Sequence, residues 1–235
     1  RNGESGLHVL HIQTITEMLL RQLVQKENNR YALSKEQIRM ITTASALHDI
    51  GKISIPDEIL NKPGRLTAEE FAVIKGHSMA GANMLSELPL DQKEEPLVKT
   101  AYEICRWHHE RYDGGGYPDG LKGEEIPVSA QVVALADVYD ALTSERCYKD
   151  AYSHEKAIEM ILAGQCGAFN PLMLECLLDI SSSLKKKMGY KSKERYEQTD
   201  LSDIASIFHD FEMDSSEKIV QQLEFERMRY NFLAE

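Results

Sequence analysis

The sequence predicts an all-α protein, and three observations support this. Apolar residues recur at steps of three and four over most of the chain, the spacing of amphipathic helices. Ser34 with Gln37 and Thr67 with Glu70 have the spacing of a capping box, which is typical of a helix start. No segment has the alternating pattern of a half-buried strand. We therefore expect a bundle of helices.

Each helix can be placed from its own signals. Apolar positions such as Leu7, Ile15 and Leu23 define the first helix, and the two capping boxes open the second and third. Pro171 fits the first turn of the last strongly patterned helix. Residues 111–127 are too rich in glycine and proline for a helix, so we expect a long structured loop there. The expected helices cover 7–24, 34 to about 50, 67–88, 97–110, 128–143, 153–163 and 171–187.

The composition divides the chain into three parts. Residues 1–187 hold the patterned helices, 188–200 form a polar linker, and 201–235 carry two further helical patterns in a C-terminal extension. The last pattern fits either a helical connector to a further domain or a dimerising coiled coil, and it is too short for sustained heptads. Because the chain starts with Arg1 and not with methionine, we expect a piece of a longer polypeptide, although removal of the initiator followed by trimming would give the same start.

Composition also excludes several classes of function. The formal net charge of -11 argues against binding a nucleic acid polymer, which needs clustered Lys and Arg. The four cysteines have no CxxC spacing, so neither a zinc knuckle nor a disulfide framework is expected. No apolar run reaches the roughly 18 residues of a membrane span. We expect a cytoplasmic globular protein with no membrane segment.

An adjacent histidine and aspartate form the centre of the predicted site. His48 and Asp49 pair imidazole with carboxylate, a combination that suits a divalent transition metal, and the carboxylate can bridge two ions. Lys52 follows three residues after Asp49 and can share its side of a helical turn. An HD dipeptide alone is weak evidence, because most such pairs are surface or capping residues.

Other residues of ligand type lie on separate predicted helices. His108 and His109 are consecutive, so on a helix their side chains would diverge by about 100° and could serve two neighbouring metals. Asp137 lies in the apolar segment VVALADVYDAL, where an unpaired carboxylate would be costly to bury. A lone histidine such as His77 is more often structural than a ligand.

Glu4 and His8 complete the set of candidates. They are four residues apart and would share one helix face, although an acidic first turn is also a common capping device. The whole set exceeds what one metal needs, which predicts a polynuclear site. Its members are Glu4, His8, His48, Asp49, His77, His108, His109 and Asp137.

Four motifs together closely resemble the HD-GYP family. They are HDIGK at 48–52, HHE at 108–110, DGGGYPDGLKG at 113–123 and ADVYDALTSERCYKD at 136–150, and the resemblance spans about residues 4–178. It implies an HD-domain helical bundle with an HD-GYP extension. It also implies a phosphodiesterase for cyclic di-GMP, a bacterial second messenger in signal transduction.

The resemblance implies roles for individual residues. The eight candidates become metal ligands with Asp49 as the bridge, and two or three divalent ions are expected, iron first and manganese as an alternative. Tyr117 would contribute to substrate binding. Asp140, Arg146 and Lys149 match positions that contact the guanine and phosphates of the ligand. The resemblance also leaves room for a receiver or sensor domain upstream, a signalling domain downstream and a homodimer.

The expected chemistry is hydrolysis of cyclic di-GMP to pGpG, to GMP or to both, by a metal-activated hydroxide. Lys52 would stabilise charge on the phosphate, next to Asp49. Within enzymes, the alternatives are a related cyclic dinucleotide such as cyclic GMP-AMP or another nucleotide. From another class, the alternative is a catalytically weak sensor module that binds a cyclic dinucleotide.

Four positions depart from the family pattern. Asn170 replaces an aspartate before Pro171, and Gln131 replaces an arginine. Cys147 stands where proline is usual, and His11 where arginine is frequent. None is an expected metal ligand, so we expect them to affect ligand surroundings and affinity more than the chemistry.

Overall fold

The computed structural model describes residues 6–27, 30–144 and 151–189. The all-α prediction is confirmed, since these ranges contain helices and no strand. The helices are α1 (Gly6–Leu23), α2 (Lys35–Ala44), α3 (Asp57–Leu60), α4 (Ala68–Ser86), α5 (Leu90–Lys93), α6 (Pro96–Trp107), α7 (Val128–Thr143), α8 (His154–Leu162) and α9 (Pro171–Gly189). Short 3-10 turns cover Ser45–Leu47, Ile50–Ser54 and Gly123–Glu125.

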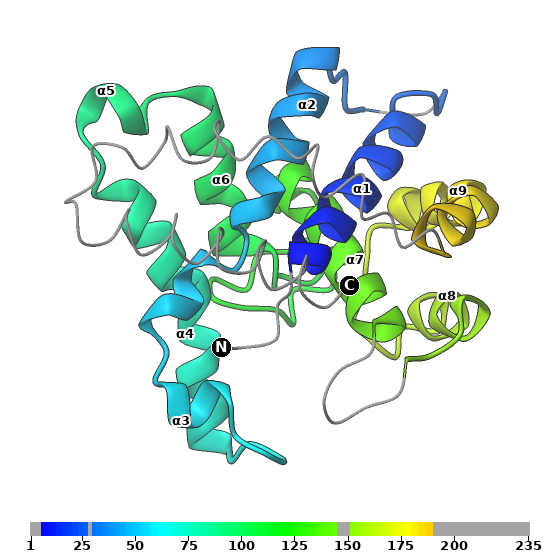
Figure 1. Cartoon of the computed structure of the whole chain (residues 1–235). Helices are drawn as coiled ribbons and strands as arrows, with labels where there is room; N and C mark the ends of the chain where they lie inside the picture. Colours follow the sequence, from blue (N-terminus) through cyan, green and yellow to red (C-terminus); the bar gives the residue numbers. More distant parts are fainter. Residues whose placement is uncertain (1–5, 28–29, 145–150, 190–235) are drawn as a thin grey trace, which may run out of the picture.

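The most buried helix is α7, which runs through the middle of the bundle (Figure 1). It packs against α1, α6 and α8, while α9 packs against α1 and α8. In Figure 1, α4 and α6 lie on one side of α7, and α8 and α9 lie on the other. The apolar run 132–136 is almost wholly buried, because neighbouring helices cover α7 on several sides. A polar side chain on α7 must therefore find partners within the protein.

Side-chain caps set the helix starts that the sequence predicts. Ser34 Oγ accepts a hydrogen bond from the Gln37 amide at 3.2 Å, and the Gln37 side chain accepts one from the Ser34 amide at 2.8 Å. Thr67 and Glu70 make the same reciprocal pair at the start of α4. Both capping boxes are confirmed.

Two predicted helix ends are wrong in ways that matter for the site. The second helix stops at Ala44, and the HD dipeptide lies between two 3-10 turns. Ser45 donates its hydroxyl to the Thr42 carbonyl, a local bond that competes with regular helix. The helix α6 ends at Trp107, so His108 and His109 lie just beyond it, where the chain enters the glycine-rich loop. The short helices α3 and α5 were not predicted.

Gly51 lets the HD turn lie directly against α4. A Cβ atom at this position would be 1.9 Å from the carbonyl oxygen of His77 and 2.4 Å from the amide nitrogen of Gly81. Both atoms belong to the backbone of α4 and cannot give way as a flexible side chain would. Only glycine permits this approach, which brings His48 and Asp49 next to α4.

The described residues reach the expected domain boundaries at only one point, the start of the polar linker. Helix α9 continues to Gly189, slightly into the expected linker. The rest of the linker and the extension 201–235 lie outside the described residues. Within the described ranges, no helix has both the length and the apolar character that crossing a membrane requires.

Candidate metal centre

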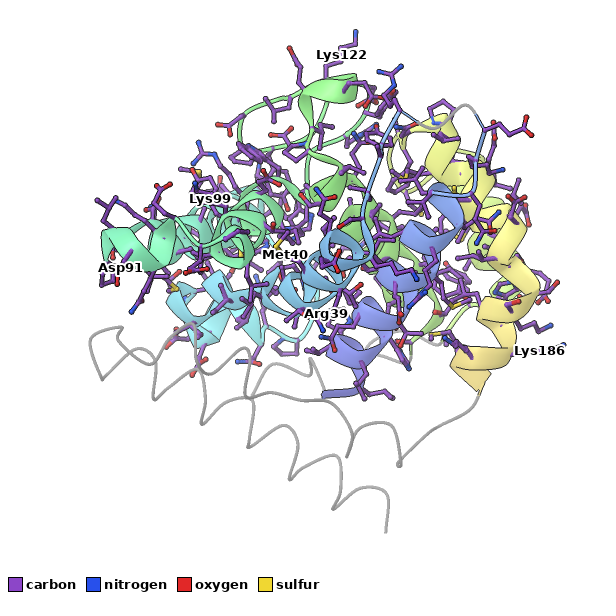
Figure 2. All side chains as sticks on the ribbon, turned by 90° about the horizontal axis from the view of Figure 1, so that it is seen from above. Arg39, Met40, Asp91, Lys99, Lys122 and Lys186 are labelled. Carbon is purple, nitrogen blue, oxygen red and sulfur yellow. The ribbon has the colours of Figure 1, made fainter. Side chains whose placement is uncertain are left out.

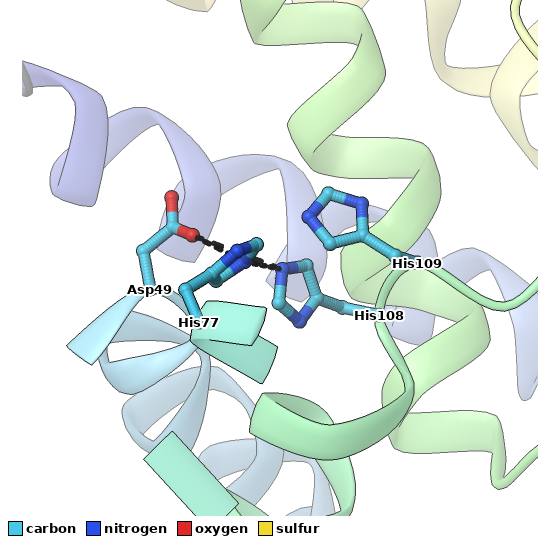
Figure 3. A group of neighbouring side chains, drawn as sticks. All are labelled: Asp49, His77, His108 and His109. Atoms are coloured by element: carbon cyan, nitrogen blue, oxygen red, sulfur yellow. Dashed lines mark hydrogen bonds and ion pairs between the residues drawn. The ribbon is translucent and has the colours of Figure 1, made fainter. Parts of the chain in front are cut away.

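Seven predicted ligands come together in two adjacent groups near the middle of the bundle. Within each group the ligand atoms lie within 4.8 Å of one another. The first group is Asp49, His77, His108 and His109 (Figure 3), and the second is His8, His48 and Asp137.

Five separate segments supply these ligands. Helices α1, α4 and α7 provide one each, the HD turn provides two, and the end of α6 provides the consecutive histidines. Their side chains converge although they are up to 129 positions apart in sequence, so packing of the bundle creates the site. His48, His77 and His108 are almost completely buried, while Asp137 is 19% exposed.

Hydrogen bonds donated by Nδ1 fix the orientation of three histidine rings. Nδ1 of His48 donates to the Ser45 carbonyl at 2.9 Å, and Nδ1 of His77 donates to the Ile74 carbonyl at 2.7 Å. His108 makes the equivalent bond to the Ile104 carbonyl at 2.9 Å. Because a carbonyl only accepts, Nδ1 carries the proton and Nε2 presents its lone pair to the site.

The lone pairs face one another at short range. Nε2 of His8 is 3.3 Å from Nε2 of His48, and Nε2 of His77 is 3.4 Å from Nε2 of His108. In these tautomers neither pair can form a hydrogen bond, and a cation that both nitrogens coordinate would remove the repulsion. Oδ1 of Asp49 is also buried without a hydrogen-bond partner. These donors fit divalent metal ions.

His108 and His109 are held in the neutral form that metal binding requires. Burial lowers the pKa of His108 to about 4, and the neighbouring His48 adds to this effect. Burial also places the pKa of His109 well below its usual value, with His108 and His77 contributing. Since only neutral imidazole coordinates a metal, both rings are ready to bind at neutral pH.

Asp49 lies between the two groups. Its Oδ1 is 3.1 Å from Nε2 of His77, and its Oδ2 is 3.1 Å from Nε2 of His48. Lys52 donates to Oδ2 at 2.6 Å. Burial alone would raise the pKa of Asp49, but the Lys52 ammonium and His48 hold it well below the usual range. The carboxylate is therefore ionised, with one oxygen directed at each group.

Asp140, expected to contact substrate, is buried behind His8. Its Oδ2 accepts from Nδ1 of His8 at 2.6 Å, and its Oδ1 lies 2.6 Å from Nδ1 of His11. Ser144 donates to the same Oδ1 at 2.9 Å. Both oxygens are engaged in these contacts, and Asp140 orients His8. His11, one of the departures from the family pattern, is part of these contacts. The contact of Asp140 with the substrate stays a prediction.

The loop that follows His109 brings Tyr117 to the site. The Tyr117 ring stacks on the His109 ring at 4.8 Å with an interplanar angle of 25°. Burial raises the pKa of the Tyr117 hydroxyl, and the negative charges of Asp49 and Asp137 add to this. The phenol is therefore a hydrogen-bond donor at neutral pH. Tyr117 thus lies beside a candidate metal ligand, while its expected role in substrate binding stays a prediction.

Glu110 organises the glycine-rich loop that follows it, a role that we did not predict from the sequence. One oxygen of this buried carboxylate accepts from the amides of Asp119 at 2.7 Å and Gly120 at 3.0 Å. Gly116 packs on the backbone here, since a Cβ would lie 2.4 Å from Cα of Glu110. An acidic residue just before a glycine-rich loop was the available signal, because the amides of such a loop need acceptors.

Two further departures from the family pattern contact each other. Nδ2 of Asn170 donates to Oε1 of Gln131 at 2.9 Å, and Nε2 of Gln131 donates to the Ile126 carbonyl at 2.8 Å. Nδ2 of Asn170 also lies 3.1 Å from the hydroxyl of Tyr31. A neutral amide pair thus occupies the place where the family pattern has arginine and aspartate. Of the remaining predicted residues, Glu4, Arg146, Cys147 and Lys149 lie outside the described residues.

Comparison with known families identifies the class of protein. The family model of the HD domain matches residues 7–169. The chain belongs to the HD domain family, and its resemblance to HD-GYP proteins is confirmed.

Curated relatives match over most of this chain. It is 42% identical over 184 residues to a probable cyclic di-GMP phosphodiesterase of Vibrio cholerae, covering 76% of this chain and 41% of the relative. It is 41% identical over 152 residues to a cyclic di-GMP phosphodiesterase of Thermotoga maritima, covering 65% and 40%. A 3'3'-cGAMP-specific phosphodiesterase of V. cholerae is 38% identical over 179 residues, covering 76% and 32%. The chain thus spans less than half the length of these relatives.

Two solved structures share the fold. Bd1817, an HDG"Y"P protein of Bdellovibrio bacteriovorus, is 22% identical with a TM-score of 0.57, covering 74% of this chain and 51% of that one. A cyclic GMP-AMP-specific phosphodiesterase of V. cholerae, V-cGAP3, is 16% identical with the same TM-score of 0.57, covering 89% and 55%. At these identities the similarity concerns the fold alone.

Proposed function

We propose that this chain is a metal-dependent phosphodiesterase that hydrolyses cyclic di-GMP to pGpG, to GMP or to both. The observation that carries the proposal is the Asp49 carboxylate, which directs one oxygen at each of two histidine-containing groups. A carboxylate between two ligand sets is the arrangement that a binuclear metal centre requires.

The ligand groups define what the metals would contact. Asp49, His77, His108 and His109 would hold one ion, and His8, His48 and Asp137 would hold a second, with Asp49 shared. When bound, the metals supply Lewis-acid activation of water and neutralise charge on the phosphoryl oxygens. Mixed imidazole and carboxylate donors suit iron, with manganese as the alternative.

Lys52 and Tyr117 act on the substrate. The Lys52 ammonium is 2.6 Å from Asp49 and only partly exposed, so a phosphate bound to metals at Asp49 would lie next to it. There it stabilises the negative charge that develops as the 3' oxygen leaves. Tyr117, stacked on His109, forms one wall of the site and donates its hydroxyl to the ligand. Arg146 and Lys149 remain predicted contacts for guanine and phosphate.

The substrate follows from relatives whose names state it. Relatives that are 41% to 42% identical to this chain are named for cyclic di-GMP, which favours that dinucleotide. A relative at 38% identity is named for 3'3'-cGAMP, which makes this the second candidate. A receiver or sensor domain, a signalling domain and a homodimer remain predicted partners, and the predicted setting is cytoplasmic.

One experiment separates these functions. The chain is purified anaerobically, its metals are analysed, and the products formed from cyclic di-GMP and from 3'3'-cGAMP are separated by chromatography. We expect iron or manganese at two or three ions per chain and turnover of cyclic di-GMP in preference to 3'3'-cGAMP. Binding of cyclic di-GMP without turnover by the metal-loaded chain would indicate the sensor instead.

A paired variant tests the bridging carboxylate. Asp49→Ala should lose activity and most bound metal, because it removes a ligand common to both groups. Asp91→Ala is the matched control, since Asp91 lies on the outer surface on α5 (Figure 2). Full metal content with normal turnover in Asp49→Ala would contradict the proposed centre.

A further inference from the structure

A lysine on α4 reaches the edge of the metal centre without being assigned to it by the motifs. Lys75 precedes the ligand His77 by two residues, and its ammonium is 5.6 Å from the centre of the Tyr117 ring. The same ring stacks on the ligand His109. The ammonium is also 5.3 Å from the ring of Phe71, one helical turn earlier. Lys75 thus lies near two aromatic rings, one of which stacks on a candidate metal ligand.

The charge of Lys75 is not neutralised by the described residues. Among them it contacts no carboxylate, whereas the two arginines that flank the His108–His109 pair are both neutralised. Arg106 binds Asp119 through two nitrogens, at 2.7 and 3.0 Å, and Arg111 binds Asp113 at 2.7 Å. Aromatic faces hold an ammonium in place while leaving its charge available to an anion.

A chain of net charge -11 needs local cations to bind an anionic dinucleotide. A cyclic dinucleotide carries two phosphates. The metal centre and Lys52 would contact only the one that is being cleaved. The other remains close to the site, because both belong to one small ring. A lysine acts on phosphate as a point charge, so its position suffices without a planar geometry.

We propose that Lys75, held by Phe71 and Tyr117, binds the phosphate of the substrate that is not being cleaved. This inference rests on the proposed function and adds a cation from α4 to the predicted contacts from Arg146 and Lys149. Lys75 would therefore favour substrates with two phosphates over simple phosphodiesters.

The test compares two substrates in the metal-loaded chain. Lys75→Gln should raise KM for cyclic di-GMP by roughly tenfold or more, the scale of one lost hydrogen bond to a charged group. The loss in kcat/KM on bis(p-nitrophenyl) phosphate, which has a single phosphodiester, should be about tenfold smaller. Lys75→Arg should restore most of the affinity because it keeps the charge. Lys186→Gln is the control, since Lys186 lies far away at the outer end of α9 (Figure 2).

Each other outcome has a definite meaning. An equal loss on both substrates, or an unchanged KM for cyclic di-GMP, would overturn the role of Lys75 while leaving the proposed function intact. 3'3'-cGAMP has the same two phosphates, so its inhibition constant should rise as much as KM for cyclic di-GMP. A loss confined to cyclic di-GMP would show that Lys75 contacts a guanine and would also overturn the proposal. If the unmodified chain hydrolyses only the simple phosphodiester, the proposed function itself fails.

Discussion

Nδ1 of His8 lies 2.6 Å from Oδ2 of the buried Asp140, and this contact fixes which nitrogen of His8 faces the other ligands. A carboxylate behind a ligating histidine both orients the ring and increases its basicity. In this chain the contact joins α1 to α7 next to the second ligand group, which contains His8. Asp140 is therefore part of the metal centre through His8.

We expect Asp140→Asn to weaken metal binding by about 10- to 100-fold, because the amide polarises His8 less than a carboxylate does. The measurement is metal content during titration with a chelator, together with the Tm of the metal-free chain. Asp179→Asn, which changes a partly exposed aspartate on α9, should leave metal binding unchanged. Unaltered affinity in Asp140→Asn would show that His8 needs no such partner.

A second prediction concerns the contact between the HD turn and α4. Gly51→Ala should destabilise the protein by roughly 1 to 3 kcal/mol and lower metal content, because the new Cβ must displace the backbone of α4. Gly76→Ala on the same helix is a matched control with open space around the added atom. It should stabilise the helix by about 0.5 to 1 kcal/mol. Urea denaturation and metal analysis of both variants check this, and equal behaviour would contradict the packing argument.

The sequence was sufficient to predict the longer helices, and it predicts seven candidate ligands that the structure brings together. Local signals determined the starts of α2 and α4, since a capping box depends only on residues three positions apart. The ligands could be selected because several histidines and carboxylates occur in motifs that resemble one family. Their division into two groups around Asp49 depends on packing, and no local pattern in the sequence specifies it.

What the sequence could not predict depends on contacts between distant segments. The family resemblance predicted only a ligand contact for Asp140, and its contacts with His8 and His11 come from the packing of α1 on α7. We predicted the end of α6 too far along the chain. The apolar periodicity carries no information about the loop that Glu110 anchors. Lys75 was not singled out, because its significance comes from the Tyr117 ring, far away in sequence.

A third prediction addresses the amide pair between Gln131 and Asn170. Asn170→Asp alone should destabilise by about 1 to 3 kcal/mol, since it places a carboxylate near Glu124 in a largely buried position. Adding Gln131→Arg should recover part of the loss by forming an ion pair. A double-mutant cycle by chemical denaturation should give a coupling of roughly 0.5 to 3 kcal/mol. Additive effects would show that the two positions act independently.

A fourth prediction separates catalysis from metal retention at Lys52. A protonated ammonium does not coordinate metals, so Lys52→Ala should keep its metals and lose kcat by roughly 100-fold or more, the scale of one transition-state stabiliser. Lys156→Ala, which breaks a similarly spaced but exposed ion pair on α8, should leave kcat unchanged. Metal analysis and steady-state kinetics on the same samples check this. An unaltered kcat in Lys52→Ala would remove its catalytic role.

The last prediction concerns Glu4 and a third metal. Seven ligands in two groups already satisfy two ions once Asp49 is shared and water and substrate fill the remaining positions. Glu4 lies outside the described residues, four positions before His8, a spacing that lets both side chains reach one ion if the helix includes them. Glu4→Ala should therefore lower metal content by about one ion per chain while two stay bound, with activity reduced rather than abolished. Glu17→Ala, which removes an ion pair with Arg21 within α1, controls for a general effect on that helix. Metal analysis under metal-replete conditions decides the matter, because unchanged content with full activity in Glu4→Ala would leave no third site.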